Sequence, residues 1–121
     1  MARLQLIGRA LARTRSELDG RLIYTSIRRK DFEETGALPS DSEDVINLTL
    51  AVGGAEVAVI LVEQMTGGFK ISFRSRNDLD CSVLAEQFQG GGHKAAAGAF
   101  LRDPLEIAQS KVLDAVRAAM R

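Results

Sequence analysis

Two hydrophobic periodicities follow one another in the first 36 residues. Leucine and isoleucine first recur at spacings of three, four and seven residues, at Leu4, Ile7, Leu11 and Leu18. This spacing places them on one side of a helix that Gly20 can end. Residues 21–27 then alternate loosely and are rich in β-branched and aromatic side chains, as is typical of a strand. The pattern therefore predicts a helix over residues 1–20, a strand, and a short charged helix up to Gly36.

A proline and a pair of glycines divide the middle of the chain. Pro39 breaks the preceding segment. Ser40 and Glu43 match a capping box, in which each side chain accepts the other residue's backbone N–H at the start of a helix. A helix through residues 45–50 should follow and end at Gly53-Gly54.

Residues 57–76 predict two strands of different character. Residues 57–62 are apolar without alternation, which suits a strand in the middle of a sheet with both faces covered. After a turn at Gly67-Gly68, apolar and polar residues alternate strictly over residues 69–74. This second strand should have one buried and one wetter face. The wetter face would carry Lys70, Ser72, Arg74 and Arg76.

A short helix, a strand and a longer helix are predicted for the rest of the chain. Asp80 can cap a helix that carries Leu84 and Phe88 one turn apart and that the glycines at 90–92 stop. Residues 100–101 fit a last strand.

The sequence Asp103-Pro104-Leu105-Glu106 marks the start of the final helix, because it combines a capping acid, a proline at the first helical position and a glutamate at the third. The buried face of this helix would be Ala108, Val112, Ala115, Val116 and Ala119. The expected fold is a single domain of the α/β or α+β class, a mixed sheet of about four to five strands packed with helices.

Composition excludes several classes of protein. A chain of 121 residues with 45% hydrophobic and 26% charged residues is typical of one globular domain. Its 16 basic and 16 acidic residues balance, so any contact with nucleic acid must be local. The single cysteine, Cys81, fits a reducing cytoplasm. The longest apolar run, residues 57–62, is far shorter than the roughly 18 residues that a membrane span needs.

Candidate chemistry centres on the loop Gly90-Gly91-Gly92-His93-Lys94. Three glycines allow successive backbone N–H groups to converge on an anion, because no Cβ blocks the approach. His93 and Lys94 add donors, and Arg74 and Arg76 would bring guanidinium groups if their strand lies beside the loop. Glycines also gather at helix ends and tight turns that bind nothing, so the three glycines alone do not distinguish an anion-binding loop from a purely structural turn.

Catalytic machinery is not evident in the sequence. Hydrolysis of a phosphoester by two metal ions needs a cluster of carboxylates and histidines, but the chain has one histidine and scattered acids. We therefore assign no catalytic residue and no metal ligand. Cys81 is assigned no chemistry, because a reactive thiolate needs an electropositive site.

The segments 71–76, 84–88 and 90–98 together resemble the first subfamily of the DHH-associated domain. Two motifs are the basis of this resemblance. One is the pair Arg74-Ser75; the other is Gly-Gly-Gly-His followed by Ala-Ala-Gly, which comes after that pair at the distance found in the family. The resemblance covers about residues 21–120, so residues 21–121 would form this domain and residues 1–20 a helix joining it to a catalytic domain. On this view Met1 would begin a truncated chain.

The resemblance implies a parent enzyme, a manganese-dependent phosphoesterase acting on short RNA, pAp, cyclic dinucleotides or single-stranded nucleic acid in the cytoplasm. Its DHH domain would hold the manganese, and the associated domain would bind the substrate through positions matching Arg74 and Gly90 to His93. Arg76 and Lys94 lie in the matching motif as further substrate-binding candidates. The motifs of the DHH domain are missing here, so this chain should bind without hydrolysing. Its partners would be the nucleotide or RNA and its own DHH domain, with a homodimer as a further option.

Two other readings stay open at this point. The chain would be a docking or dimerisation module if the glycine loop only packs against a partner. It would bind tRNA if it is instead similar to the C-terminal domain of alanyl-tRNA synthetase, which shares a glycine-rich loop. The histidine and the Ala-Ala-Gly sequence favour the phosphoesterase reading.

Overall fold

The computed structural model describes residues 1–51 and 53–121. Within them the chain forms one mixed sheet of six strands in the order β1-β2-β3-β4-β6-β5, with helices on both faces. The predicted α/β class is confirmed. The elements are α1 (Ala2–Ala12), β1 (Arg15–Glu17), β2 (Leu22–Ile27), α2 (Arg29–Thr35), the 3-10 helix η1 (Pro39–Ser42), α3 (Glu43–Leu50), β3 (Val57–Glu63), β4 (Phe69–Ser75), α4 (Cys81–Glu86), β5 (Gly91–Gly92), β6 (Ala96–Leu101) and α5 (Leu105–Ala119).

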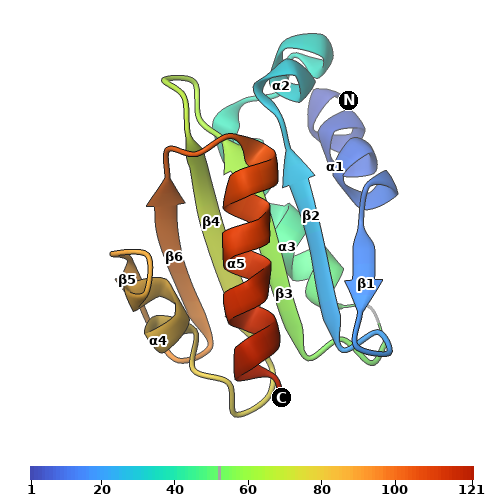
Figure 1. Cartoon of the computed structure of the whole chain (residues 1–121). Coiled ribbons are helices and arrows are strands. Elements are labelled where there is room, and N and C mark those ends of the chain that lie inside the picture. The colour runs from blue at the N-terminus through green and yellow to red at the C-terminus, as the bar shows by residue number, and fades with distance from the viewer. Residues whose placement is uncertain (52) are drawn as a thin grey trace.

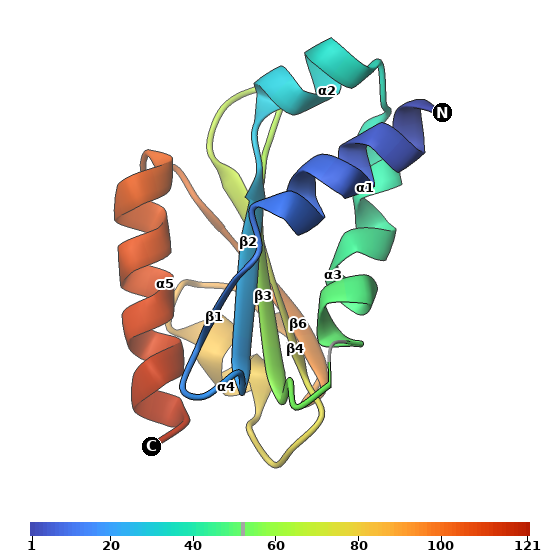
Figure 2. The same cartoon turned by 90° about the vertical axis from the view of Figure 1, so that its right-hand side faces the viewer.

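Two hydrophobic clusters lie on the two sides of the sheet. Helices α4 and α5 cover one face, and α1 and α3 cover the other, as the edge-on view in Figure 2 shows. The strand at the centre, β3, contributes to both clusters: Val57, Val59 and Leu61 face α5, and Ala58, Ile60 and Val62 face α1 and α3. Residues 57–62 are all buried, so the continuous apolar run correctly predicted a central strand.

The first helix is shorter than predicted. It ends at Ala12, and residues 15–17 form the edge strand β1, which pairs antiparallel with β2. The buried residues of α1 are Leu6 and Ala10, whereas Leu4 is 65% exposed. Leu18 packs on the α5 side of the sheet, while Leu6 and Ala10 pack on the α1 side. One straight helix cannot reach both sides, and the chain turns through positive φ at residues 18–20.

Of the two helix starts predicted from capping side chains at Asp80 and Ser40, one is confirmed and one is wrong. Asp80 caps α4 as expected, because its carboxylate accepts a hydrogen bond from the amide of Ser82 at 2.9 Å. The predicted Ser40–Glu43 box is wrong: Asp41 accepts from the amide of Leu38 at 2.8 Å, and η1 leads into α3. Helix α3 ends at Leu50 rather than at Gly53-Gly54, and Val52 of the expected helix lies outside the described residues.

The C-terminal elements differ from the prediction in their bounds. Strand β6 begins at Ala96, four residues before Phe100, and its residues Ala97 and Ala99 are buried in the hydrophobic cluster that α4 and α5 cover. Helix α5 begins one residue after Pro104, which is its N-cap, and Asp103 instead pairs with Lys111 at 2.9 Å. Ala119 is exposed; Leu113 and Met120 complete the buried face.

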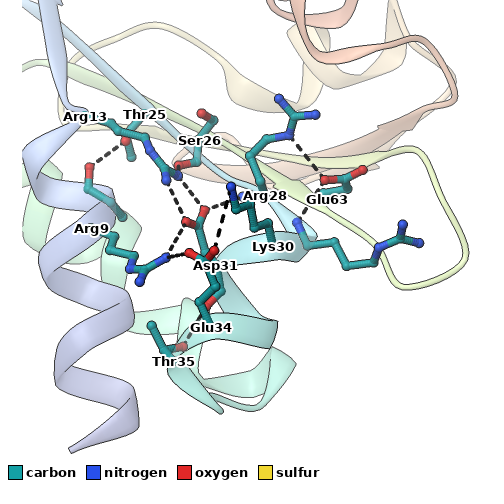
Figure 3. Close-up of polar contacts among 12 residues, drawn as sticks. Arg9, Arg13, Thr25, Ser26, Arg28, Lys30, Asp31, Glu34, Thr35 and Glu63 are labelled. Carbon is teal, nitrogen blue, oxygen red and sulfur yellow. Dashed lines mark hydrogen bonds and ion pairs between the residues drawn. The ribbon is translucent and has the colours of Figure 1, made fainter.

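A polar cluster fastens α1 to α2 (Figure 3). Asp31 is buried, and its carboxylate accepts hydrogen bonds from both terminal nitrogens of Arg13, at 2.5 and 2.6 Å, and from the amide of Arg28 at 2.7 Å. Burial alone would raise the pKa of Asp31, but these hydrogen bonds outweigh it and hold the pKa below its usual value. The nearby hydroxyl of Thr25 donates to the carbonyl of Ala10 at 2.6 Å, so the end of α1 is tied to β2 as well.

Candidate functional site

The predicted wetter face of β4 lies on the side of the sheet away from α4 and α5. Ile71 and Phe73 are buried in the cluster under α5, so the alternating residues Lys70, Ser72 and Arg74 face the other way. Pairing with β6 sets Lys70 opposite Phe100, Ser72 opposite Gly98 and Arg74 opposite Ala96. Because residues directly opposite in a sheet share a face, these six positions form one surface. The strand residues of the α1–α3 cluster come from β2 and β3, so this surface lies beside that cluster.

The glycine loop is part of a β-hairpin formed by β5 and β6. Gly91 pairs with Gly98 and Gly92 with Ala97, and His93 and Ala96 exchange backbone hydrogen bonds of 2.8 and 3.3 Å. His93 is thus opposite Ala96, which is opposite Arg74. The register brings Arg74 and His93 to the same face, separated by one strand, so their backbones are roughly 10 Å apart.

The glycines are needed where the hairpin approaches β6. A Cβ on Gly90 would lie 2.1 Å from the carbonyl oxygen of Gly98, and one on Gly92 would lie 2.6 Å from the Cα of Ala97. The amides of Gly90 and His93 donate to the carbonyls of Ala85 and Ala96, each at 2.8 Å. The expectation that successive amides of the loop converge on an anion therefore does not hold for these two. Gly91 has open space around it.

Arg76 and Lys94 lie just outside the paired strands of this region. Arg76 follows the last residue of β4, is exposed, and its amide donates to the carbonyl of Glu56 at 2.8 Å. Lys94 occupies the turn between β5 and β6, where its Nζ lies 4.0 Å from a carboxylate oxygen of Asp78. The carbonyl of Lys94 accepts from the amide of Cys81 at 2.7 Å, which holds the turn against the start of α4.

A pocket of about 480 Å³ adjoins the same face at Arg74. It lies between β3 and β4 on one side and α2, η1 and α3 on the other. Its lining residues are Phe32, Pro39, Ser40, Ser42, Glu43, Ile46, Ile60, Val62, Glu63, Gln64, Met65, Thr66, Lys70, Ser72 and Arg74. No local pattern in the sequence indicates this pocket, because its two walls, residues 32–46 and 60–74, are separate segments that only the packing of α3 on the sheet brings together.

Metal binding by the described residues has no support in the structure. No group of three or more His, Cys, Asp and Glu side chains among residues 1–51 and 53–121 is placed to hold an ion. The donor set of this part of the chain therefore does not fit the manganese that the family resemblance implies. Cys81 is fully buried, and burial raises the pKa of its thiol to about 11, which keeps it protonated and unreactive near neutral pH. Within the described residues no helix is long and apolar enough to cross a membrane.

Comparison with known proteins identifies relatives over nearly the whole chain. A bifunctional oligoribonuclease and PAP phosphatase of Thermus thermophilus is 35% identical over 114 residues, which are 93% of this chain and 33% of that protein. An exopolyphosphatase-related protein from Bacteroides fragilis superposes with a TM-score of 0.83 at 26% identity, covering 98% of this chain and 34% of that chain. The chain thus spans about a third of the length of these relatives.

A further solved structure has the same fold at low sequence identity. The pGpG-specific phosphodiesterase of Vibrio cholerae superposes with a TM-score of 0.67 at 8% identity, covering 96% of this chain and 39% of that chain. The DHHA1 domain family matches residues 19–121. This chain therefore belongs to the DHHA1 domain family, the domain associated with DHH-family phosphoesterases.

Proposed function

We propose that this chain is the substrate-binding part of a DHH-family phosphoesterase that hydrolyses short oligoribonucleotides, pAp or related nucleotides, and that the chain alone binds without hydrolysing. The observation that carries the proposal is the β4–β6–β5 register, which sets Arg74 and His93 on one face beside a pocket. The named activity of the Thermus thermophilus relative supports this class of substrate.

The chemistry of this face suits a phosphate group. The guanidinium of Arg74 can bind two phosphate oxygens at once, and within the described residues its one hydrogen bond is to the adjacent carbonyl of Phe73, at 3.0 Å. His93 offers a second donor, and the open space at Gly91 lets a ligand approach the backbone closely. Since the chain has no net charge, the attraction comes from these local groups.

Hydrolysis is assigned to a separate DHH domain. The described residues hold no cluster for a metal ion, so the manganese would be held by that domain, where it supplies an activated water and charge stabilisation. The present chain would contribute the groups that hold the substrate in place. Because the proposed cleft would use groups of both domains, we expect this domain by itself to bind weakly, in the millimolar to high micromolar range.

Binding by the chain alone can be tested by NMR. On titration with pAp or a dinucleotide, we expect the amide signals of residues 90–94 to shift, and Arg74→Ala to remove the shift. Arg15→Ala is the control, because Arg15 is likewise an arginine on a strand but is exposed at the far edge of the sheet. If the loop signals stay unmoved up to millimolar ligand, binding by this domain is refuted.

A second experiment separates substrate binding from docking. The chain is mixed with a separately expressed DHH domain, and manganese-dependent hydrolysis of pAp or a dinucleotide is measured. Under the proposal, activity is restored, and His93→Ala or Arg74→Ala abolishes it. Restored activity that both variants leave unchanged would show that the chain only docks against the DHH domain.

A further inference from the structure

The turn that contains His93 follows a strand of only two residues. Within the described residues, β5 lies at the edge of the sheet and pairs with β6 alone (Figure 1). Both residues of β5 are glycines, which restrict the backbone least. Pairing with β6 therefore places His93 opposite Ala96, but the turn at residues 93–95 needs further contacts to stay in one position.

Those contacts come from residues 75–81, the segment that joins β4 to α4. Its two ends donate to consecutive carbonyls of the turn. The amide of Ser75 donates to the carbonyl of Ala95 at 3.0 Å, and the amide of Cys81 donates to the carbonyl of Lys94 at 2.7 Å. The turn is thus placed by both ends of the 75–81 segment, so the shape of this segment determines where the turn lies.

The side chain of Asn77 sets the shape of the 75–81 segment. Its Oδ1 accepts hydrogen bonds from the amide of Leu79 at 2.9 Å and from the hydroxyl of Ser75 at 2.8 Å. An asparagine oxygen that accepts from an amide two residues further on forms an Asx turn, which fixes the local backbone. The Nδ2 of Asn77 donates to a carboxylate oxygen of Glu56 at 2.7 Å. One side chain therefore bends the segment and ties it to the residue before β3.

We infer that Asn77 is a positioning residue for the phosphate site: it keeps the 75–81 segment in the shape that holds His93 on the same face as Arg74. Asn77 is exposed and belongs to neither hydrophobic cluster, so its role can be separated from the stability of the core. This inference rests on the proposed function. It adds to that function a residue that acts through His93 rather than by contact with the ligand.

The first test measures the dissociation constant (Kd) of pAp by NMR titration of the chain as it stands. Asn77→Ala should raise the Kd about fivefold, the effect of losing one hydrogen bond that orders the site. Asn77→Asp keeps the oxygen that bends the segment, and its Kd should stay within about twofold of the wild-type value. Asn47→Ala is the matched control, because Asn47 is an exposed asparagine on α3, and it should leave the Kd unchanged.

A double-mutant cycle distinguishes positioning from a general loss of structure. If Asn77 acts through His93, Asn77→Ala should weaken binding of pAp in the wild-type chain and have no further effect in the His93→Ala variant. A merely structural role would make the two losses additive.

Hydrogen exchange tests the 75–81 segment without any ligand. The amides of Ser75 and Cys81 should exchange faster in Asn77→Ala than in Asn47→Ala, because both donate to carbonyls of the turn. In Asn77→Asp they should exchange as slowly as in the wild-type chain.

The outcomes separate this inference from the proposed function. An unchanged Kd in Asn77→Ala, while residues 90–94 still shift with pAp, would overturn the positioning role and leave the proposed function standing. Additive losses in the cycle, or a folded Asn77→Asp variant that binds as weakly as Asn77→Ala, would also overturn the positioning role alone. Signals of residues 90–94 that stay unmoved with pAp in the wild-type chain would overturn the proposed function and this inference together.

Discussion

At the scale of single residues, the adjacent glycines at 90–92 serve different purposes. Gly90 and Gly92 leave no room for a side chain, because an added Cβ would meet the backbone of β6. Gly92 also has a φ of +147°, which side chains rarely adopt. Gly91 has nothing within 4 Å of an added Cβ and no positive φ. The triplet is thus a packing requirement at its two ends and an open position in its middle.

This difference predicts unequal effects of alanine. Gly90→Ala and Gly92→Ala should each lower the free energy of unfolding by about 2–4 kcal/mol, because backbone has to move to relieve the clash. Gly91→Ala, the matched control, should change it by less than about 0.5 kcal/mol. Urea unfolding followed by circular dichroism measures all three. Equal losses at the three positions would contradict the assignment.

At the scale of elements, ion pairs join helices and strands that are far apart in the sequence. Asp31 joins α2 to Arg13 just beyond the end of α1, and Arg9 contacts the same carboxylate at 3.4 Å (Figure 3). On the other face, Arg117 of α5 donates to both carboxylate oxygens of Glu17 on β1, at 2.6 and 2.8 Å. These pairs fasten α2 to the N-terminal helix and α5 to the edge strand β1.

Removing the charge of Asp31 should loosen the junction of α1 and α2. Asp31→Asn should lower the free energy of unfolding by about 2 kcal/mol, since a buried carboxylate loses hydrogen bonds from charged donors. The arginines are 39–40% exposed, so water can solvate them in the variant, which limits the loss. Asp114→Asn removes an exposed acid that pairs with Arg117 and is the control expected to have little effect. Hydrogen exchange should show faster exchange of the α1 amides in Asp31→Asn. Exchange that stays slow throughout α1 in this variant would refute the role of Asp31 in holding α1 to α2.

At the scale of the whole molecule, the net charge is zero, but the charged side chains are not paired evenly over the surface. Most arginines near the sheet edges pair with acids: Arg13 with Asp31, Arg21 with Glu56, Arg28 with Glu63 and Arg117 with Glu17. Lys70 and Arg74, on the face of β4 beside the pocket, make no such pair within the described residues. A chain of zero net charge therefore presents a local cationic wall.

Pairing also sets the response to acid. Hydrogen bonds from Arg117 lower the pKa of Glu17, and those from Arg13 and the Arg28 amide outweigh burial to lower that of Asp31. A lowered folded pKa gives stability that is complete above the unfolded value, about 3.9 for Asp and 4.3 for Glu, and that is lost as pH falls through the folded value.

We therefore expect the free energy of unfolding to be nearly constant between about pH 7 and pH 5 and to fall below about pH 4. Asp31→Asn should show a smaller fall, because it no longer carries one of the responsible carboxylates. Urea unfolding at several pH values between 7 and 3 provides the measurement. Parallel curves for the wild-type chain and the variant would exclude Asp31 as a contributor.

Local chemistry in the sequence was enough to predict several elements. The apolar run at 57–62 predicted the central strand, alternation at 69–74 predicted a strand with one open face, and Asp80 predicted the start of α4. Such features depend on neighbouring residues and on the period of a helix or strand, which the sequence displays directly. The family, too, was correctly predicted from the motif at residues 90–98 and Arg74.

Features that depend on distant contacts needed the tertiary structure. The helix over residues 1–20 stops at Ala12 because Leu18 packs on the opposite side of the sheet from Leu6, which no local pattern reveals. The glycines at 90 and 92 are explained by the closeness of β6, and the pocket by the packing of α3 over the sheet. The sequence by itself led to the prediction that Arg74 and residues 90–93 bind a phosphate. The order of strands decided that Arg74 and His93 share one face and that a cavity lies beside them, because side-chain positions across a sheet follow from register.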